Sequence, residues 1–523
     1  MSLVYNVPFV SIFLSILIAV LCTLFKNGRN AQRLTFALWI GVAVGSAMLL
    51  STLMFNGGTS FTYAAGHYPA PWGNELRAGP LEALFALVYS IVMLLSLSGG
   101  AEHTFEDVVE EKVSLYYTVM NLLFAGMLAL IYTNDIFTSY VFIEISTIAA
   151  CSIIMAKGEG ESLLESMRYL IMYLIGSTMF LFGVVILYSI TGHLLMEFLQ
   201  KEIVALWMSG EYQLPLAASL ALMLIGLCIK TAIFPFHSIL PGAHGSATTA
   251  SSAVLSGLLL ESYVILIIKI IYRVFTPEII ASYHVYDIMF AFGIIAMLLG
   301  SYYALKEDDI KRMLAYSSAA QMGYIFVAIG IGTNAGAVAA CLHIITHAFT
   351  KAMLFTTSGA LIGVSGHSRD FYDLRGAAHR DRLAGIGFTI GAISMIGVPL
   401  LACFVSKLYI AIASLIYPPQ AILTLFALGL SMVLNALYFV PAVIAIWTPK
   451  RLNTVHHHSG NAGHVAVGPK EAEPVEEYAE EERDPALHLL FKISTVAFIV
   501  LNFAVGCGFL PIVNVLQLGL MLL

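Results

Sequence analysis

Residues 227–244 read LCIKTAIFPFHSILPGAH, and the rest of the chain is organised around them. Lys230 lies inside an apolar run, and Pro235, five residues later, cannot donate a backbone N–H to an uninterrupted helix; Pro241 follows. In a bilayer an ionisable side chain and a freed carbonyl are both costly unless protein or water satisfies them. The stretch therefore indicates a polar cavity at membrane depth. The alternative is a lysine near a helix end whose ammonium reaches the interface beside a proline kink.

The composition places the chain in a membrane. Of its 523 residues 59% are hydrophobic and 11% are charged, the mean hydropathy is +0.87, and long apolar runs recur. The first run, 3–25, has no basic residue before it and no small-residue cleavage site, so we expect a retained helix rather than a signal peptide. The six cysteines stand singly without a CxxC pair, which argues against iron–sulfur, zinc and disulfide frameworks.

Fourteen apolar runs predict about fourteen transmembrane helices in an all-α polytopic protein, with both termini on one side. They cover 3–25, 32–55, 78–100, 113–132, 134–156, 162–190, 214–236, 249–273, 283–304, 310–331, 335–363, 382–410, 419–447 and 486–510. Of the 25 Lys and Arg residues, 18 fall on the opposite side, against four on the side of the termini: Arg77, Lys201, Lys269 and Arg273. Basic loops favour the cytoplasm, so we expect a multi-pass protein of the cell inner membrane with both termini outside.

Two segments are polar enough to lie outside the bilayer. Residues 453–485 contain three consecutive histidines and then many acidic residues and prolines, a composition that cannot bury a core. We expect a cytoplasmic loop; a loosely bound metal at the histidines is the alternative. Residues 194–208 mix apolar and charged residues as an interfacial helix on the outer surface would.

Two further charges lie deep in predicted spans. Glu144 is about ten residues into its span, hence roughly 15 Å deep and near the midplane; a protonated carboxyl in a packed bundle is the alternative interpretation. Lys407 follows a second interrupted run that contains Pro399, 177 residues after Lys230. Such pairs are typical of repeated transporters with discontinuous helices. Counting back from Lys407 by the 86 residues that separate Glu144 from Lys230 reaches Gln321, so the acidic residue is kept only in the first unit.

This spacing divides the chain into five parts. They are an N-terminal group of three helices (1–112), a first five-helix unit (113–273), a second five-helix unit (274–447), an acidic cytoplasmic loop (448–485) and a C-terminal helix (486–523).

His343, His347 and Lys351 recur at intervals of four, which places their side chains on one helix face. A buried hydrogen-bonded histidine pair, a metal site without a third ligand, and a proton relay all remain open, since imidazole both accepts and donates protons in the physiological range.

Several motifs in one order resemble the antiporter-like subunits shared by respiratory complex I, Mrp-type cation/proton antiporters and membrane-bound hydrogenases. They are KTAIFPFHSILPGAH (230–244), DDIKRMLAYSS (308–318), QMGY (321–324) and the runs 343–351 and 397–407. The resemblance covers nearly all of 113–410. It implies fourteen helices containing two inverted five-helix repeats, with helices 7 and 12 discontinuous, and proton movement as the function.

The resemblance also assigns roles to individual residues. It makes Glu144 the carboxylate of the fifth helix, Lys230 and Lys407 the lysines of the seventh and twelfth, and His343 and His347 the central relay. At one position the chain departs from the family, because the eighth-helix site often held by lysine is Glu261. This carboxyl is either an acidic relay or part of a cation site, for which only Ser256, Ser262 and Tyr263 are at hand locally.

We therefore expect a proton-translocating membrane subunit of a redox-driven multi-subunit complex. Moving Glu144 relative to Lys230 would change how tightly the lysine holds its proton. We expect no catalytic, cofactor or metal site in this chain and no nucleic acid; redox cofactors would lie in partner subunits, including a soluble arm. The expected ligands are H⁺, Na⁺ as an alternative, and lipid. A subunit of an Mrp-type Na⁺(K⁺)/H⁺ antiporter, an inorganic-carbon uptake protein and a structural scaffold remain the alternatives.

Overall fold

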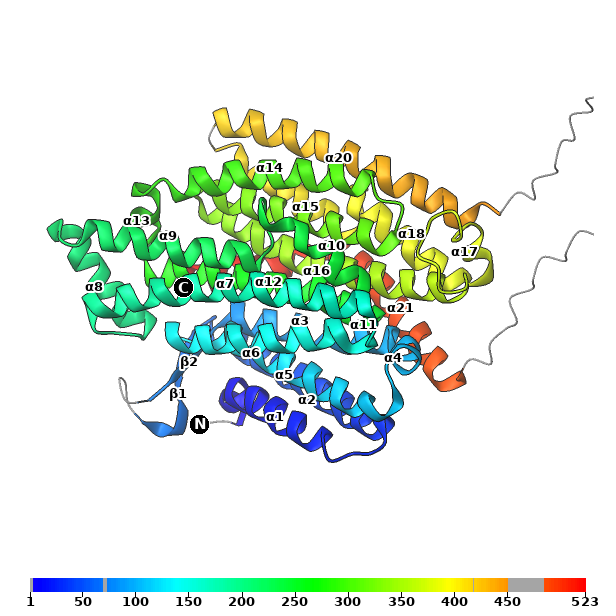
Figure 1. Cartoon of the computed structure of the whole chain (residues 1–523). Coiled ribbons are helices and arrows are strands. Elements are labelled where there is room, and N and C mark those ends of the chain that lie inside the picture. Colours follow the sequence, from blue (N-terminus) through cyan, green and yellow to red (C-terminus); the bar gives the residue numbers. More distant parts are fainter. Residues whose placement is uncertain (1–2, 69–72, 417, 450–483) are drawn as a thin grey trace, which may run out of the picture.

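The computed structural model describes residues 3–68, 73–416, 418–449 and 484–523. The chain is almost entirely helical, and its long helices run side by side (Figure 1). It begins with η1 (Leu3–Asn6), α1 (Val7–Cys22) and α2 (Gly28–Phe55). The following helices are α3 (Pro80–Gly99), α4 (Ala101–Asp107), α5 (Val113–Tyr132), α6 (Ile136–Ile154), α7 (Gly160–Thr191), α8 (Met196–Ser209), α9 (Gln213–Lys230), α10 (Leu240–Ser246), α11 (Thr249–Val254), α12 (Leu260–Lys269), α13 (Pro277–Ser282), α14 (Val285–Leu305), α15 (Ile310–Gly330), α16 (Asn334–Gly363), α17 (Ala377–Arg380), α18 (Arg382–Ile396), α19 (Ala402–Ser414), α20 (Pro418–Trp447), α21 (Pro485–Cys507) and α22 (Phe509–Met521).

The predicted all-α polytopic membrane fold is confirmed. Within the described residues, thirteen helical segments are long and apolar enough to cross a bilayer. The remaining predicted span, 382–410, is divided between α18 and α19, as a discontinuous helix requires. One predicted end is wrong, because the span 214–236 stops as a helix at Lys230. Two elements were not expected from the sequence: the terminal helix α22, and an antiparallel hairpin of β1 (Phe61–Ala64) and β2 (Glu75–Ala78).

Polar side chains set where several of these helices begin. Asp135, Asp309, Thr333 and Asp381 each accept a hydrogen bond from a backbone N–H in the first turn of α6, α15, α16 and α18 respectively. Such a cap satisfies donors that would otherwise be left unpaired at the helix end.

The two ends of the bundle differ. Both termini of the described chain, the β-hairpin, α8 and α13 lie at one end, which is the left end in Figure 1, and α4 and α17 lie at the other. The amphipathic helix expected at 194–208 corresponds to α8. The acidic loop expected within 448–485 lies almost wholly outside the described residues.

Two of the lysines and arginines assigned to outer loops are buried instead. Lys269 is 2% exposed, and its ammonium donates to the carbonyl oxygens of Leu130 (3.0 Å), Thr133 (3.1 Å) and Ile131. These carbonyls end α5, where the helix dipole favours a positive charge. Arg273, in the π-helical turn η7 (Ile270–Val274) that follows α12, is 3% exposed. A count of basic residues cannot separate such a buried cap from a loop lysine.

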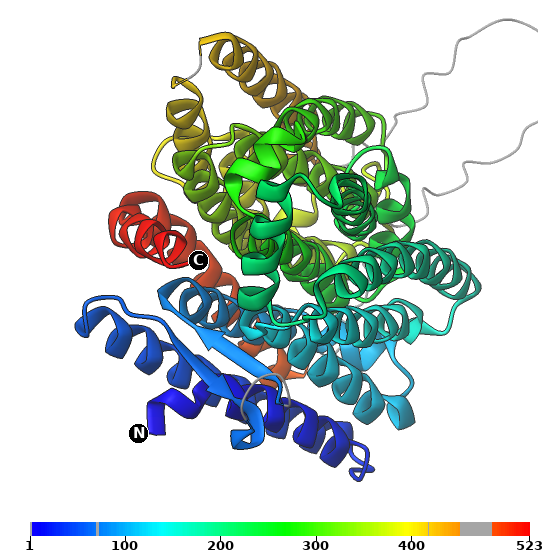
Figure 2. The ribbon, with the colours of Figure 1, turned by 90° about the vertical axis from the view of Figure 1, so that its left-hand side faces the viewer.

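Two helix pairs pack closely through glycines. In the pair α7 and α9, a Cβ on Gly176 would lie 2.9 Å from the carbonyl oxygen of Gly226. In the pair α14 and α15, a Cβ on Gly293 would lie 3.0 Å from that of Gly323. Small residues allow membrane helices to approach in this way. Figure 2 views the bundle from the end that carries the termini: α1 and α2 lie on one side of the molecule and α20 on the opposite side.

Two helical stretches between these sides are buried around nearly their whole circumference: 249–274, spanning α11, α12 and the turns beside them, and α16. A helix that is covered all round belongs to the core of a bundle. These two stretches carry Glu261, His343, His347 and Lys351.

Candidate functional site

Lys230 is the last residue of α9 and is fully buried. The chain leaves the helix at once: Ala232 has a positive φ of 48°, and helical turns resume as η5 (Phe236–Ile239) and α10, with Pro241 in the first turn of α10. The helix break predicted around Pro235 therefore lies directly beside the lysine, and the ammonium faces protein rather than lipid.

Hydroxyl and aromatic groups surround this ammonium. Lys230 Nζ donates to Thr147 Oγ1 at 2.5 Å and lies 5.1 Å from the ring centre of Tyr173 and 5.8 Å from that of Tyr263. Tyr173 is one turn from Gly176, so the close approach of α7 to α9 brings this ring against the lysine. Cation–π contacts stabilise a desolvated ammonium. The sequence reasoning gave none of these three partners a role at Lys230.

Glu144 lies one turn before Thr147 on α6 and is half-buried. It acts electrostatically on Lys230, yet the ion pairs within 4.0 Å among the described residues do not include these two. The carboxylate therefore influences the lysine across a gap.

Glu261 and His347 form a direct pair in the centre of the bundle. Both side chains are fully buried, and a short hydrogen bond joins Glu261 Oε1 to His347 Nδ1. Within the described part of the chain, Glu261 Oε2 and His347 Nε2 have no hydrogen-bond partner. Each group thus keeps one polar atom with which to pass on a proton. The carboxyl that departs from the family pattern is paired with a histidine of the expected relay.

His343 continues the row from His347. The two rings are stacked with centres 6.3 Å apart, and the other face of His343 stacks on Tyr324 at 5.4 Å. Its two ring nitrogens are within hydrogen-bond distance of Ser406 Oγ (Nδ1, 2.9 Å) and Gln321 Oε1 (Nε2, 3.2 Å). Because Ser406 precedes Lys407 in α19, this hydrogen bond connects the central histidines to the second broken helix.

Lys407 is 3% exposed and follows the break between α18 and α19. Gly397 and Leu400 have positive φ values of 103° and 76° on either side of Pro399. Lys407 Nζ donates to the carbonyl oxygens of Met395 (2.6 Å) and Ile396 (3.3 Å), the last residues of α18, and lies 4.8 Å from the ring centre of Tyr324. A half-helix C-terminus is a favourable place for a cation.

Lys351 is fully buried on α16 but is held apart from this row. Its ammonium donates to the carbonyl oxygen of Leu314 at 2.7 Å, and it interacts electrostatically with Glu261 and His244. His244, which the sequence reasoning left without a role, is 2% exposed and has neither ring nitrogen hydrogen-bonded within the described residues. Lys351 therefore stands beside the row rather than in it.

A polar cluster beyond Lys407 also escaped the sequence reasoning. Tyr324 OH donates to Ser431 Oγ (2.8 Å), and Tyr438 OH contacts Asn435 Oδ1 (2.8 Å) and Ser317 Oγ (3.1 Å). Neutral hydroxyl and amide groups in apolar helices carry no charge signal. Their spacing of three and four residues from one another was the signal that could have found them.

The described residues contain no group of three or more His, Cys, Asp or Glu side chains arranged to hold a metal ion. The local oxygen ligands considered for a cation at Glu261 are engaged elsewhere: Ser256 Oγ with Ser318 Oγ (2.6 Å), and Ser262 Oγ with Leu258 O (2.9 Å). The buried groups described here are therefore better arranged for proton exchange than for cation coordination.

Comparison with known proteins supports the resemblance noted from the motifs. Residues 133–433, more than half of the chain, match the family described as NADH:quinone oxidoreductase/Mrp antiporter, TM. The chain belongs to this family. The matched residues of the NADH:quinone oxidoreductase/Mrp antiporter family include every charged and histidine side chain of the candidate site, from Glu144 to Lys407.

Individual members of the family cover most of the chain. It is 32% identical over 400 residues to NADH-quinone oxidoreductase subunit N of Desulforudis audaxviator, covering 76% of this chain and 77% of that protein. It is 28% identical over 409 residues to a Na(+)/H(+) antiporter subunit of Bacillus subtilis, covering 78% and 80%. A chain of the membrane-bound sulfane sulfur reductase, an archaeal respiratory membrane complex, superposes with a TM-score of 0.80 at 25% identity, covering 99% and 96%.

Proposed function

We propose that the chain is a proton-translocating membrane subunit of a multi-subunit complex, and that protons move between Lys230 and Lys407 through Glu261, His347 and His343. The observation that carries the proposal is the buried row itself. Glu261 bonds His347, His347 stacks on His343, and His343 bonds Ser406 beside Lys407. Buried ionisable groups inside a membrane protein are expensive, and their alignment between two broken helices favours a transfer path.

The first step takes place at Lys230. Its single hydroxyl partner and two aromatic faces stabilise the ammonium less than a paired carboxylate would, so a change in the position of Glu144 shifts how firmly the proton is held. A proton released there crosses to Glu261 past Tyr263, which lies two residues from Glu261 on the same helix. Water completes this step.

The second step uses the paired carboxyl and imidazoles. Glu261 Oε1 exchanges a proton with His347 Nδ1, and a proton that leaves from His347 Nε2 moves on towards His343. Imidazole can take a proton on one nitrogen and release one from the other. Ser406 and Tyr324 then connect His343 to the surroundings of Lys407.

The energy for this movement comes from partner subunits. The relatives named NADH-quinone oxidoreductase and sulfane sulfur reductase support a redox-driven complex, with its cofactors in other subunits. We propose that the chain lies in the cell inner membrane with both termini outside, because the basic residues concentrate at the opposite end.

Exchange of Na⁺ for protons is the second candidate, since a Na(+)/H(+) antiporter subunit is 28% identical to this chain. The two serines that would help coordinate a cation at Glu261 already bond other groups, which favours the proton-only function.

The test is proton uptake by vesicles that contain the assembled complex. Lys230→Ala should abolish proton uptake while the complex still assembles. Proton uptake at the wild-type rate would overturn the proposal, and wild-type uptake that depends on Na⁺ would favour the second candidate.

A further inference from the structure

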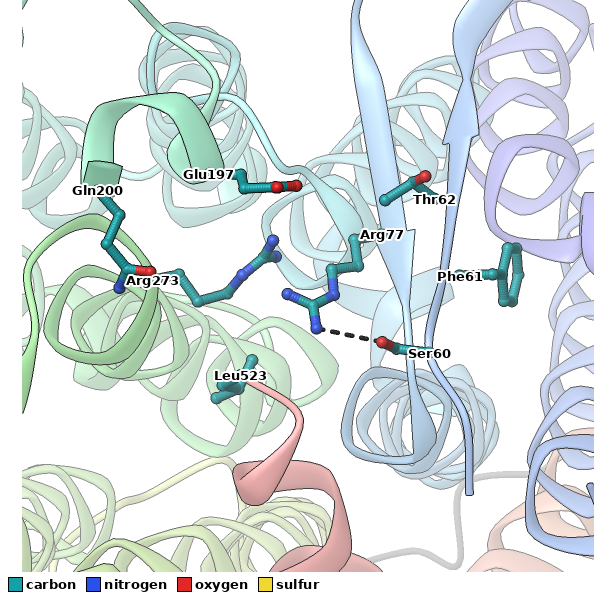
Figure 3. A pocket seen from close by; sticks show the side chains of 8 residues that line it. All are labelled: Ser60, Phe61, Thr62, Arg77, Glu197, Gln200, Arg273 and Leu523. Carbon is teal, nitrogen blue, oxygen red and sulfur yellow. Dashed lines mark hydrogen bonds between the residues drawn. The ribbon is translucent and has the colours of Figure 1, made fainter. Parts of the chain in front are cut away.

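A cavity of about 400 Å³ lies at the end of the bundle that carries both termini (Figure 3). It is bounded by β1 and β2 of the hairpin, by α8, by the turn η7 and by the last residue of the chain. It is separate from the row of buried charges, and nothing in the proposed proton path uses it.

Arg273 is the most deeply buried charge in this cavity. Its side chain is 3% exposed, and within the described residues its Nε and Nη1 atoms have no hydrogen-bond partner. A guanidinium carries five N–H donors and never loses its charge in proteins. Leaving such donors unpaired in a buried place is costly, so the site is built to receive an acceptor.

Arg77 points into the same space from β2 (Figure 3). Its Nη2 donates to Ser60 Oγ at 3.1 Å and to the carbonyl oxygen of Leu522. Among the described residues neither Arg77 nor Arg273 forms an ion pair within 4.0 Å. Two guanidinium groups that face one space without a counterion create a concentrated positive site.

The acidic residues nearby already have other partners. Glu197 Oε1 pairs with Lys201 at 2.8 Å, Glu75 Oε2 accepts from Asn134 Nδ2 at 3.1 Å, and Glu82 Oε2 accepts from the N–H of Gly79 at 2.8 Å. The hydrogen bond from Lys201 lowers the pKa of Glu197 below its ordinary value, so Glu197 is a carboxylate at neutral pH.

Gln200 holds the two walls of the cavity together. Its Nε2 donates to the carbonyl oxygens of Tyr272 (2.9 Å) and Phe275 (2.7 Å), which fixes α8 against the turn that carries Arg273. The guanidinium is therefore positioned in advance, which reduces the entropy lost when a ligand binds.

We propose that this cavity binds the phosphate group of a phospholipid headgroup, with Arg273 and Arg77 as the two binding cations. Arginine forks match phosphate oxygens with parallel hydrogen bonds. The place of the cavity suits a lipid, because it lies at the end of the membrane helices beside the amphipathic helix α8. Phe61 and Leu523 offer apolar lining for the glycerol end, and Glu197 at the edge offers a carboxylate to a headgroup amine.

The test is to purify the full-length chain with its copurifying subunits in mild detergent and to count the phospholipids that remain by mass spectrometry. We expect about one tightly held phospholipid per chain in the wild type and its loss in Arg273→Gln. Arg273→Lys, which keeps the charge and removes the fork, should retain an intermediate amount. Arg33→Gln, an exposed arginine on α2, is the charge-matched control and should keep the wild-type amount.

Three outcomes would overturn the proposal. They are equal phospholipid retention in the wild type and in Arg273→Gln, displacement of the lipid by millimolar inorganic phosphate, and a wild-type complex in which a partner's acidic side chain fills the cavity instead. If Arg273→Gln fails to assemble, Arg77→Gln decides the question, because this half-buried side chain also retains hydrogen-bonding contacts away from the lipid. Loss of the lipid in Arg77→Gln supports the site, and full retention overturns it.

Discussion

Lys230 and Lys407 lie 177 residues apart, and the protein holds them in different ways. Lys230 ends its first half-helix and has one hydroxyl partner, whereas Lys407 belongs to the second half-helix and donates to two carbonyl oxygens at the end of the first. The same offset relates Thr147, which bonds Lys230, to Tyr324, whose ring faces Lys407. Equivalent positions thus contact equivalent lysines, but with a hydroxyl on one side and an aromatic ring on the other.

The difference suggests a division of labour. A cation that sits on helix-terminal carbonyls is stabilised by fixed dipoles, while Lys230 depends on a carboxylate that does not touch it. Gln321 occupies the position that corresponds to Glu144 and hydrogen-bonds His343 instead. The first half can therefore be adjusted through Glu144, and the second half is connected directly to the central histidines.

The largest expected effect comes from removing either lysine. Lys230→Ala should reduce proton uptake by roughly 100-fold, the loss typical of a group that transfers protons, while the complex assembles normally. Lys407→Ala should reduce uptake by a similar factor and also lower the melting temperature, because it leaves two helix-end carbonyls without a donor. The checks are vesicle proton uptake and thermal unfolding. Equal melting temperatures for the two variants would remove the distinction between the halves.

Glu144→Gln should weaken uptake less, by roughly tenfold, because it removes a charge that acts at a distance. The amide keeps the shape and hydrogen bonding of the side chain. Gln321→Ala is the matched change in the second half, and we expect it to perturb His343 through its lost hydrogen bond. Vesicle proton uptake measures both variants. Full activity of Glu144→Gln would support a packed, protonated carboxyl instead.

Lys269 sharpens the comparison because it is a buried lysine outside the row. It donates to three carbonyl oxygens at the end of α5. Lys269→Met should cost about 2 kcal/mol of stability by leaving those carbonyls unpaired. Proton uptake per assembled complex should remain at the wild-type level. A Lys269→Met complex that is stable but does not translocate protons would place Lys269 in the path.

Sequence signals that are local identified most of the fold and several members of the site. Apolar runs predicted the spans, and a proline near a lysine predicted both broken helices. Contacts between distant segments were missed, among them Ser406 with His343 and Lys269 with the end of α5. The face presented by Glu261 was also beyond periodicity, since the π-helical turn η6 (Leu255–Leu259) changes the helical register just before it. The hairpin and the arginine cavity depend on such distant contacts as well.

The smallest effect is expected from the acidic segment 471–484, most of which lies outside the described residues. Deleting residues 471–483, and keeping Asp484, which caps α21 and pairs with Arg29 at 2.6 Å, should leave membrane insertion and proton uptake unchanged. Immunoblots of membranes and vesicle assays check this. Failure of the deleted chain to insert would contradict it.

Glu261→Gln gives the most direct test of the central claim that protons pass between the two halves through the buried row. Glutamine keeps the size of the side chain but cannot exchange a proton with His347. Proton uptake should be measured in vesicles with Na⁺ and in a Na⁺-free buffer. The account predicts that wild-type uptake is the same in both and that Glu261→Gln blocks it in both. Wild-type uptake that requires Na⁺, with that requirement lost in Glu261→Gln, would contradict the account.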